Sequence, residues 1–272
     1  MGKNFSNMIV MNTGTPQGCV LSPTLYNLFT HDCASSDDTV DMAKFADDTT
    51  LCGHVTDDDD TRYRAQVHDV TEWCHRNNLH LNVNKTKEIV IDFKTHKSPI
   101  DPLIINGSEV ERVDTFKFLG VNISNNLKWE NHIVNNLKGA QQKMYFLRLL
   151  KSFNVSSYIL VNFYRSSIES ILSNAILVWY KSATKKDIDK LNRVVKNASY
   201  VIGSSMRKLD TIYEERVKSR TEKIMSDDTH PSHHLFELLP SGRRLRSYGG
   251  TRSTDRFLNS FYPCATRLYN DS

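Results

Sequence analysis

The sequence has few cysteines, and their arrangement excludes two kinds of cross-linked fold. Its five cysteines are odd in number and widely scattered, and no two of them form a C-x-x-C pair. A disulfide framework needs paired cysteines, and a zinc ribbon needs closely spaced ones. Cys52 with His54, and Cys74 with His75, match no structural zinc pattern. We therefore expect reduced thiols and a reducing compartment.

Glycine, proline and long apolar runs are scarce as well. With 11 Gly, 7 Pro, 39% hydrophobic and 24% charged residues among 272, the composition is that of a globular chain and not of a collagenous or disordered one. The longest apolar stretch, residues 168–180, contains polar side chains and is shorter than the ~20 residues of a membrane span. No apolar secretory signal follows Met1, so we expect a protein that is not secreted and has no membrane helix, and the choice between nucleus and cytoplasm stays open.

Charge is distributed unevenly along the chain. Residues 1–100 contain 9 Lys and Arg against 14 Asp and Glu, whereas residues 101–272 contain 26 against 17. The net charges of these two parts are therefore −5 and +9. A carboxylate-bearing metal site followed by a phosphate-binding region produces this asymmetry, and so does an ordinary solvated helical surface. Charge alone leaves both explanations open.

Strand and turn patterns dominate up to about residue 125. Two short strands, at 40–45 and 49–55, flank Ala46-Asp47-Asp48 and predict a hairpin with an acidic tip. Asn106-Gly107 predicts a second tight hairpin. The acidic run at 57–60 is interpreted as a helix start and not as a metal cluster. The other predicted elements are a helix from Ser22 to about Cys33, a helix from Asp58 with Tyr63, Val67, Val70 and Trp73 on one face, and strands at 87–93 and 116–123.

Helical periodicity replaces this pattern beyond residue 125. Four helices are predicted, at 129–151, 155–181, 185–202 and 209–225. The tail from residue 227 is basic and has little periodicity, so we expect it to be irregular. The sequence therefore predicts an α+β fold in three regions, which are residues 1–125, 126–226 and 227–272.

Asp47 and Asp48, at the predicted hairpin tip, are candidate metal ligands. Carboxylate oxygens are the hard ligands that Mg²⁺ prefers, and a tight turn can hold two of them beside a phosphate. Ordinary solvated turn residues show the same pattern. Other motifs in the chain decide between the two explanations.

Four motifs, one of which contains these two aspartates, follow one another along the chain. They are Gly14-Thr-Pro-Gln-Gly-Cys-Val-Leu-Ser-Pro23, Lys44-Phe-Ala-Asp-Asp-Thr49, Trp73-Cys-His-Arg-Asn-Asn-Leu-His-Leu-Asn-Val-Asn-Lys-Thr-Lys87 and Phe116-Lys-Phe-Leu-Gly120. In that order they resemble the palm loop and helix, the catalytic hairpin, the next palm helix and turn, and the primer-grip hairpin of one polymerase family, the reverse transcriptases of non-LTR retrotransposons or LINE-like elements. Phe236-Glu-Leu-Leu-Pro-Ser-Gly-Arg-Arg244 and Phe261-Tyr-Pro263 are similar to the ends of such polyproteins.

The resemblance implies an RNA-templated DNA synthesis in which Asp47 and Asp48 are catalytic and bind Mg²⁺. A primer 3′-hydroxyl would attack the α-phosphate of a deoxynucleotide, with two divalent ions at the attacking and leaving oxygens. Lys85 corresponds to a catalytic, phosphate-facing lysine, and a solvated turn lysine is the alternative. The implied partners are an RNA template and a DNA primer, with no membrane and no small-molecule cofactor beyond deoxynucleotides.

The resemblance also assigns binding residues and regions. Gln17 and Gly18 correspond to the loop that contacts the template and the incoming nucleotide, and Phe118, Leu119 and Gly120 correspond to residues that position the primer. An ordinary packed strand is the alternative for Phe116 and Phe118, and it does not exclude this role. The implied fold is a partial palm, with a mixed or antiparallel sheet, followed by a helical, basic, thumb-like region.

One departure from the family concerns the third catalytic aspartate, which such palms carry on a strand well before the Gly-Thr-Pro-Gln-Gly loop. Only 13 residues precede Gly14, and none is Asp or Glu. We therefore expect a polymerase part truncated before that aspartate and catalytically incomplete by itself, or else a longer reading frame in which Met1 is internal. The alternative is a non-catalytic or domesticated nucleic-acid-binding protein.

A second, minor resemblance covers residues 129–151. This segment looks like the N-terminal element that precedes an AlkB-type dioxygenase involved in tRNA modification. Iron dioxygenases need a His-x-Asp/Glu pair, and none of the ten histidines is followed two positions later by Asp or Glu. We therefore expect no dioxygenase activity.

Overall fold

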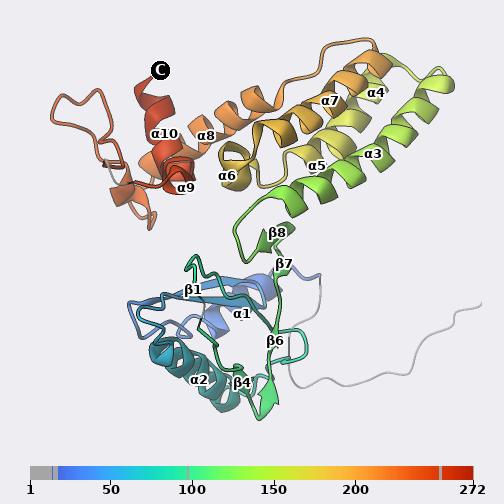
Figure 1. Cartoon of the computed structure of the whole chain (residues 1–272). Helices are drawn as coiled ribbons and strands as arrows, with labels where there is room; N and C mark the ends of the chain where they lie inside the picture. Colours follow the sequence, from blue (N-terminus) through green and yellow to red (C-terminus); the bar gives the residue numbers. More distant parts are fainter. Residues whose placement is uncertain (1–13, 15–17, 97, 251–252, 272) are drawn as a thin grey trace, which may run out of the picture. The chain divides into compact units, whose positions relative to one another are not determined.

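The computed structural model describes residue 14 and residues 18–271, apart from 97, 251 and 252. Contacts divide the chain into two compact units. The first contains the described residues up to Glu88 together with Lys94–Arg112, and the second contains Ile89–Phe93 and the described residues from Val113 onward. The sequence predicted a first region that extends to residue 125. In the structure, residues 113–125 instead belong to the same unit as the helices that follow them. Both units combine helices with short strands, so the predicted α+β class is confirmed (Figure 1).

The first unit contains two helices and three two-stranded sheets in its described residues. They are α1 (Ser22–Phe29), α2 (Thr61–Arg76), β1 (Val40–Phe45) paired with β2 (Asp48–Gly53), β3 (Lys87–Glu88) paired with β6 (Glu111–Arg112), and β4 (Ile104–Ile105) paired with β5 (Ser108–Glu109). The β3–β6 pair is parallel and the other two pairs are antiparallel. The predicted acidic hairpin and the Asn106-Gly107 hairpin are both confirmed.

Two predicted elements of this unit are shorter than the sequence indicates, and the sheet is divided. The first helix ends at Phe29 and not near Cys33, because the Lys44 ammonium binds the carbonyls of Thr30 and Cys33. The strand predicted at 87–93 is paired only at Lys87–Glu88. Among the described residues the strands form separate pairs, and not one mixed sheet.

The core of the first unit consists of two small hydrophobic clusters that α2 connects. The clusters are Val67, Leu103, Ile105 and Val110, and Cys33, Val70 and Cys74. Tyr63 and Trp73 pack against their edges and are half-buried. The helix face predicted from the sequence is therefore the face that packs, as expected for an amphipathic helix.

The second unit begins with a hairpin and continues with helices. β7 (Thr115–Phe118) and β8 (Val121–Ser124) form an antiparallel pair where the sequence predicts one strand, because Leu119-Gly120 makes a turn with both residues at positive φ. The helices are α3 (Glu130–Ser152), α4 (Ser157–Tyr164), α5 (Ser170–Leu172), α6 (Ile176–Trp179), α7 (Lys185–Ile202), α8 (Leu209–Met225), α9 (Asp255–Leu258) and α10 (Phe261–Asn270). The helices predicted at 129–151, 185–202 and 209–225 are confirmed.

The helix predicted at 155–181 is interrupted. α4 passes into a π-helical turn at Arg165–Glu169, and the helix breaks after α5, where Ala175 adopts φ +47°. The Ser173 carbonyl accepts a hydrogen bond from Arg216, and the Asn174 carbonyl accepts one from the Trp179 indole N–H at 2.8 Å. These side-chain donors replace the backbone donors of a continuous helix, and apolar periodicity does not reveal them.

A continuous core of 24 buried residues holds the second unit together, with Trp179, Tyr164 and Tyr213 among its largest members. The tail is not irregular throughout, which corrects the prediction for residues 227–272. α10 forms there because it buries Ala265 against this core and contacts α8. None of the helices in the described residues is long and apolar enough to cross a membrane.

Candidate functional site

Asp47 and Asp48 lie at the tip of the β1–β2 hairpin. Phe45 pairs with Asp48 across a two-residue turn of Ala46 and Asp47, and Ala46 adopts φ +52°. Both aspartates are exposed. Their carboxylates are therefore accessible from solvent to a cation or to a phosphate-bearing ligand.

Lys44 fixes this hairpin to the end of α1. Its Nζ donates hydrogen bonds to the carbonyls of Thr30 and Cys33, the latter at 2.8 Å. Carbonyls at a helix C-terminus carry partial negative charge and bind cations well. Burial and, to a smaller extent, the nearby Asp47 carboxylate raise the pKa of Tyr26 on α1. Sequence reasoning missed Lys44 as a positioning residue, although it belongs to the Lys-Phe-Ala-Asp-Asp-Thr motif.

The two aspartates form a pair and not a larger cluster. No group of three or more His, Cys, Asp or Glu side chains that could hold a metal ion occurs among the described residues. Mg²⁺ is commonly held by one or two carboxylates together with substrate phosphates and water. The donor set at the tip therefore suits an Mg²⁺ ion that arrives with a nucleotide, and it is too small to enclose an ion by itself.

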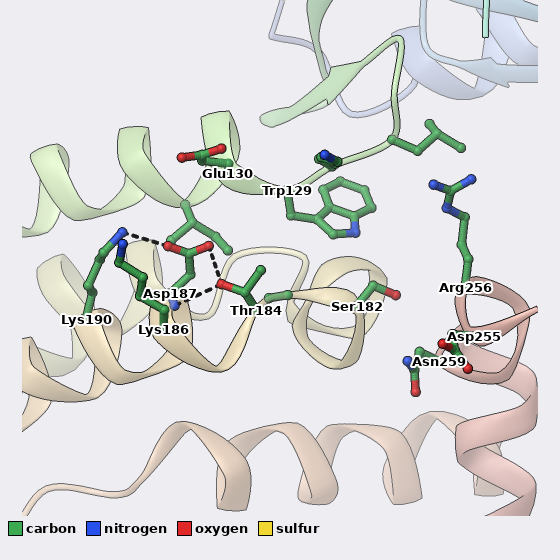
Figure 2. Close-up of a pocket in the computed structure, with 14 residues that line it drawn as sticks. Trp129, Glu130, Ser182, Thr184, Lys186, Asp187, Lys190, Asp255, Arg256 and Asn259 are labelled. Carbon is green, nitrogen blue, oxygen red and sulfur yellow. Dashed lines mark hydrogen bonds and ion pairs between the residues drawn. The ribbon is translucent and has the colours of Figure 1, made fainter. Parts of the chain in front are cut away.

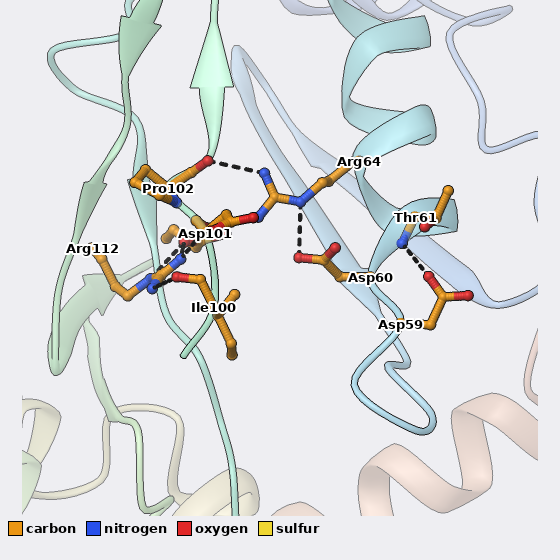
Figure 3. Close-up of polar contacts among 9 residues, drawn as sticks. Asp59, Asp60, Thr61, Arg64, Ile100, Asp101, Pro102 and Arg112 are labelled. Atoms are coloured by element: carbon orange, nitrogen blue, oxygen red, sulfur yellow. Dashed lines mark hydrogen bonds and ion pairs between the residues drawn. The ribbon is translucent and has the colours of Figure 1, made fainter. Parts of the chain in front are cut away.

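The acidic run at 57–60 precedes α2, as predicted. Asp59 Oδ1 accepts a hydrogen bond from the Thr61 backbone N–H at 3.0 Å, and Asp60 accepts one from Arg64 Nε at 2.9 Å (Figure 3). Carboxylates are stabilised at this position by the unpaired N–H groups of the first helical turn. These aspartates therefore serve the local structure of α2.

Two arginines hold the segment 100–102 from opposite sides. Arg64 donates to the carbonyls of Pro102 at 2.9 Å and Asp101 at 2.7 Å, and Arg112 donates to those of Ile100 and Asp101, both at 2.9 Å (Figure 3). The guanidinium fork supplies several donors in one plane, which allows each side chain to bind two carbonyls. Nothing in the sequence pattern indicated these contacts, because the bonded carbonyls are backbone groups.

Gly18 and Lys85, two further predicted residues of the first unit, lie in exposed turns. Gly18 adopts φ +80°, a conformation that favours glycine, whereas Gln17 lies outside the described residues. Lys85 is exposed, and its backbone N–H donates to the Asn82 carbonyl at 3.0 Å. Within the described part of the chain, no hydrogen bond or ion pair joins Lys85 to Asp47. The structure thus brings the two aspartates together but does not link Lys85 to them.

Phe118, Leu119 and Gly120 lie together in the β7–β8 hairpin of the second unit. Leu119 has φ +45° and Gly120 has φ +84°, so both turn residues are in the left-handed region that favours glycine and asparagine. A Cβ at position 120 would lie 3.2 Å from Asn174 Nδ2, which explains the glycine. Leu119 is exposed in a conformation that is costly for a bulky residue, and such strain is often found at functional positions.

A cavity of about 520 Å³ in the second unit is lined by residues of α3, α7 and α9 and their flanking loops. Asp187 on its wall accepts hydrogen bonds from Lys190 Nζ at 2.8 Å and from Thr184 Oγ1 at 2.7 Å (Figure 2). These bonds, that of Lys190 first, hold the pKa of the Asp187 carboxyl below its usual range. The Thr184 hydroxyl also accepts from the Asp187 backbone N–H at 3.2 Å, so this carboxylate belongs to the N-terminal cap of α7. The Thr-x-x-Asp spacing was the sequence signal for it.

Known families match the two parts of the chain separately. Residues 2–123 match the family described as reverse transcriptase (RNA-dependent DNA polymerase). Residues 129–170 match the family described as alkylated DNA repair protein alkB homolog 8, N-terminal, which overlaps the segment identified from the sequence. No solved structure matches the chain.

Three curated relatives come from Drosophila melanogaster. The probable RNA-directed DNA polymerase from transposon BS is 26% identical over 90% of this chain and 30% of its own length. The probable RNA-directed DNA polymerase from transposon X-element is 30% identical over 49% of this chain and 16% of its own length. The RNA-directed DNA polymerase from mobile element jockey is 24% identical over 65% of this chain and 20% of its own length. The matches span less than a third of the length of each relative. The chain is therefore a homologue of the LINE-like reverse transcriptases of non-LTR transposons.

Proposed function

We propose that this chain is part of an RNA-directed DNA polymerase in which Asp47 and Asp48 bind the catalytic divalent cation. The observation that carries the proposal is the Lys-Phe-Ala-Asp-Asp-Thr motif on an exposed hairpin tip that Lys44 anchors to α1. The two-residue turn places both aspartates at the exposed hairpin tip, where a phosphate-bound ion could reach them. The reverse transcriptase match over residues 2–123 supports the same assignment.

The other residues have positioning tasks in this proposal. Bound Mg²⁺ supplies positive charge to the attacking and leaving oxygens during phosphoryl transfer. Gln17 and Gly18 contact the template and the incoming nucleotide, and Lys85 faces a phosphate. The exposed turn of Leu119 and Gly120, with Phe118 beside it, positions the primer.

The regional assignment is also a proposal. Residues 1–125 correspond to part of a palm, residues 126–226 to a thumb-like region and residues 227–272 to a basic tail. The net charge of +9 over residues 101–272 supports contacts between this half and the phosphates of an RNA–DNA duplex.

Primer extension tests the proposal. We expect the purified chain to bind deoxynucleotide in an Mg²⁺-dependent manner but not to extend a primed RNA template, because only a pair of carboxylates meets at the tip among the described residues. Asp47→Asn and Asp48→Asn should abolish the Mg²⁺-dependent binding, whereas Asp69→Asn, at an exposed position of α2, should preserve it. Binding that is unchanged in all three variants would refute the metal assignment. If the wild type extends the primer and Asp47→Ala abolishes this extension, the chain is not catalytically incomplete, and the result supports the hairpin as the catalytic site.

A non-catalytic nucleic-acid-binding function is the second candidate, and the basic second half of the chain favours it. Phosphate contacts release counterions, so affinity should fall steeply as salt rises. This candidate is favoured if the affinity for nucleic acid falls steeply with salt and is unchanged by Mg²⁺ and by Asp47→Asn. A flat salt titration would exclude it. The match at residues 129–170 supports no dioxygenase, because the sequence has no His-x-Asp/Glu pair.

A further inference from the structure

Apolar side chains occupy two opposite faces of α3. The face that packs into the core comprises Ile133, Ala140, Met144 and Leu147. The other face comprises Tyr145, Phe146, Leu149 and, at the C-terminal end of the helix, Phe153, and we call it the aromatic face. At ~100° per residue these four side chains fall within one stripe opposite the buried face. Their exposed fractions are 61, 47, 39 and 71%, so three large rings meet solvent.

Only positive charge surrounds the aromatic face in the sequence. Residues 131–168 contain five Lys and Arg and no Asp or Glu. Lys143 Nζ lies 5.9 Å from the centroid of the Phe146 ring, and the rings of Phe146 and Tyr145 meet edge to face at 5.4 Å between centroids. Exposed rings flanked by cations are the shared feature of surfaces that bind single-stranded nucleic acid, because rings stack on bases while cations bind phosphates.

A groove of about 430 Å³ lies between α3 and α7, which run side by side (Figure 1). Its cations are Arg148, Lys190 and Arg193, its amides are Gln141 and Asn197, and its apolar residues are Leu137, Met144 and Val194. None of these described lining residues carries a carboxylate. Gln141 and Arg148 are seven residues apart and therefore share the side of α3 adjacent to Tyr145. The groove therefore lies beside Tyr145, at one edge of the aromatic face.

We propose that the aromatic face of α3 binds single-stranded nucleic acid. Bases stack on Tyr145, Phe146 and Phe153, and the phosphates bind the cations at the two edges of this face, Arg148 beside Tyr145 and Lys143 beside Phe146. A duplex does not fit this role, because its bases are already stacked on one another. A second copy of the same face fits poorly too, because two positive surfaces would repel each other. The proposal goes beyond the polymerase function, and it does not depend on the aspartate hairpin.

Fluorescence anisotropy on the full chain tests this binding with three probes of equal length, about 12 nucleotides, within the usual site size. The probes are a single-stranded oligouridine, an abasic oligomer with the same phosphates, and a blunt RNA duplex. We expect the oligouridine to bind most tightly, and the abasic oligomer to bind at least about tenfold more weakly, because it retains charge but has no rings to stack.

Variants at exposed positions separate stacking from apolar docking. Phe146→Leu and Phe153→Leu keep an apolar side chain but remove the ring, so each should weaken oligouridine binding by about 5- to 100-fold. Phe257→Leu on α9 is the matched control, because Phe257 is 44% exposed against 47% for Phe146. Arg148→Gln should lower the slope of log affinity against log salt by about 0.7, the contribution of one single-strand phosphate contact. Circular dichroism verifies that each variant is folded.

Several results would overturn the proposal. Equal affinity for the abasic oligomer and the oligouridine would exclude stacking. Wild-type affinity in both phenylalanine variants, or an equal loss in Phe257→Leu, would place binding elsewhere on the chain. Tighter binding of the duplex, unaffected by these variants, would indicate a duplex contact instead. A concentration-dependent dimer that the phenylalanine variants dissociate, without any effect on oligouridine affinity, would assign the face to self-association.

Discussion

The two units of the chain differ most in how their cores are built. In the first unit, seven buried residues form two separate clusters, and the strands form isolated pairs. In the second unit, 24 buried residues from α3 to α10 form one cluster. Stability scales with the apolar area removed from water, so the helical unit should be much the more stable. The candidate metal hairpin therefore lies on the unit with the smaller core, and the aromatic face of α3 lies on the unit with the larger one.

Two of the three two-residue hairpins in the described residues differ in how well their turn residues suit the backbone. Asn106-Gly107 in the first unit has both residues at positive φ and uses the residue pair that this turn prefers. Leu119-Gly120 in the second unit has the same sign of φ but places a bulky residue in the first position. Ala46 in the aspartate hairpin of the first unit is also a non-glycine residue at positive φ, so an unfavourable turn residue occurs in both units.

The largest effect should come from removing a large side chain of the second core. Trp179 is fully buried, and its indole N–H is bonded to the Asn174 carbonyl. Trp179→Ala should lower the free energy of unfolding of the second unit by about 3–5 kcal/mol. Val67→Ala in the first unit should cost only about 2 kcal/mol, because two methyl groups are lost from a small cluster.

Hydrogen exchange resolved by peptide measures both losses. We expect Trp179→Ala to increase exchange in α8 much more than in α2, and Val67→Ala to do the reverse. Equal increases in both helices for either variant would mean that the two units unfold as one, and the contrast between their cores would then have no energetic consequence.

A smaller, pH-dependent effect should be confined to the second unit. His132 is fully buried and makes edge-to-face contacts with Trp129 and Trp179. Burial lowers the pKa of its imidazole from the ordinary value of 6.5. The unfolded chain therefore binds a proton at a higher pH than the folded protein does. Stability should be fully present above about pH 6.5 and should fall as the pH drops toward the folded pKa.

Urea denaturation between about pH 5 and 7 tests this effect, since most carboxylates are still ionised there. His132→Gln should flatten the dependence of unfolding free energy on pH, whereas His80→Gln, at an exposed position of the first unit, should leave it unchanged. If the free energy of unfolding of the wild type instead rises as the pH falls across this window, the predicted direction is wrong and His132 does not cause the pH dependence.

Local patterns predicted much of this structure, and long-range contacts account for most of what they missed. The acidic hairpin, the Asn-Gly turn and three long helices follow from period, turn residues and caps, which lie close together in sequence. The break after α5 depends on Arg216, more than 40 residues from Ser173, and the end of α1 depends on Lys44. The periodicity of a single sequence cannot reveal side-chain donors that come from distant residues. It also assigned no role to the aromatic face of α3, because apolar residues on two sides of a helix weaken its amphipathic pattern.

The candidate site also has a part that local sequence patterns predicted and a part that they missed. The motif around Asp47 and Asp48 was readable because its residues are contiguous, and the structure confirms the hairpin on which they lie. The roles of Lys85, Gly18 and Phe118 remain predictions, because they depend on ligands and on spatial relations that sequence order does not define. Lys44 shows what was missing, since its contribution is a contact with backbone carbonyls and not a recognisable side-chain pattern.

A modest gain in stability should follow from relieving the turn of the second hairpin. Leu119→Asn places the preferred residue at the first position of this turn and should stabilise the protein by about 0.5–1 kcal/mol. If the exposed leucine contacts a primer, the same variant should bind a primed template less tightly. Thermal denaturation and primed-template binding therefore test strain and function together. A variant that is less stable than the wild type would show that Leu119 contributes packing, and the strain argument would fail.

The smallest effect on stability should come from the two residues with the largest proposed effect on function. Asp47 and Asp48 are exposed at a turn and lie outside both clusters of the first unit. Asp47→Asn and Asp48→Asn should therefore change the free energy of unfolding by less than about 0.5 kcal/mol, the usual limit for surface substitutions. Denaturant titrations with and without Mg²⁺ give the decisive comparison, because an ion that binds the folded state adds stability that these variants should lose. If either variant costs 2 kcal/mol or more without Mg²⁺, the aspartates support the hairpin itself. If the variants lose only the stability that Mg²⁺ adds, the two aspartates bind the ion and contribute little to the fold of the first unit.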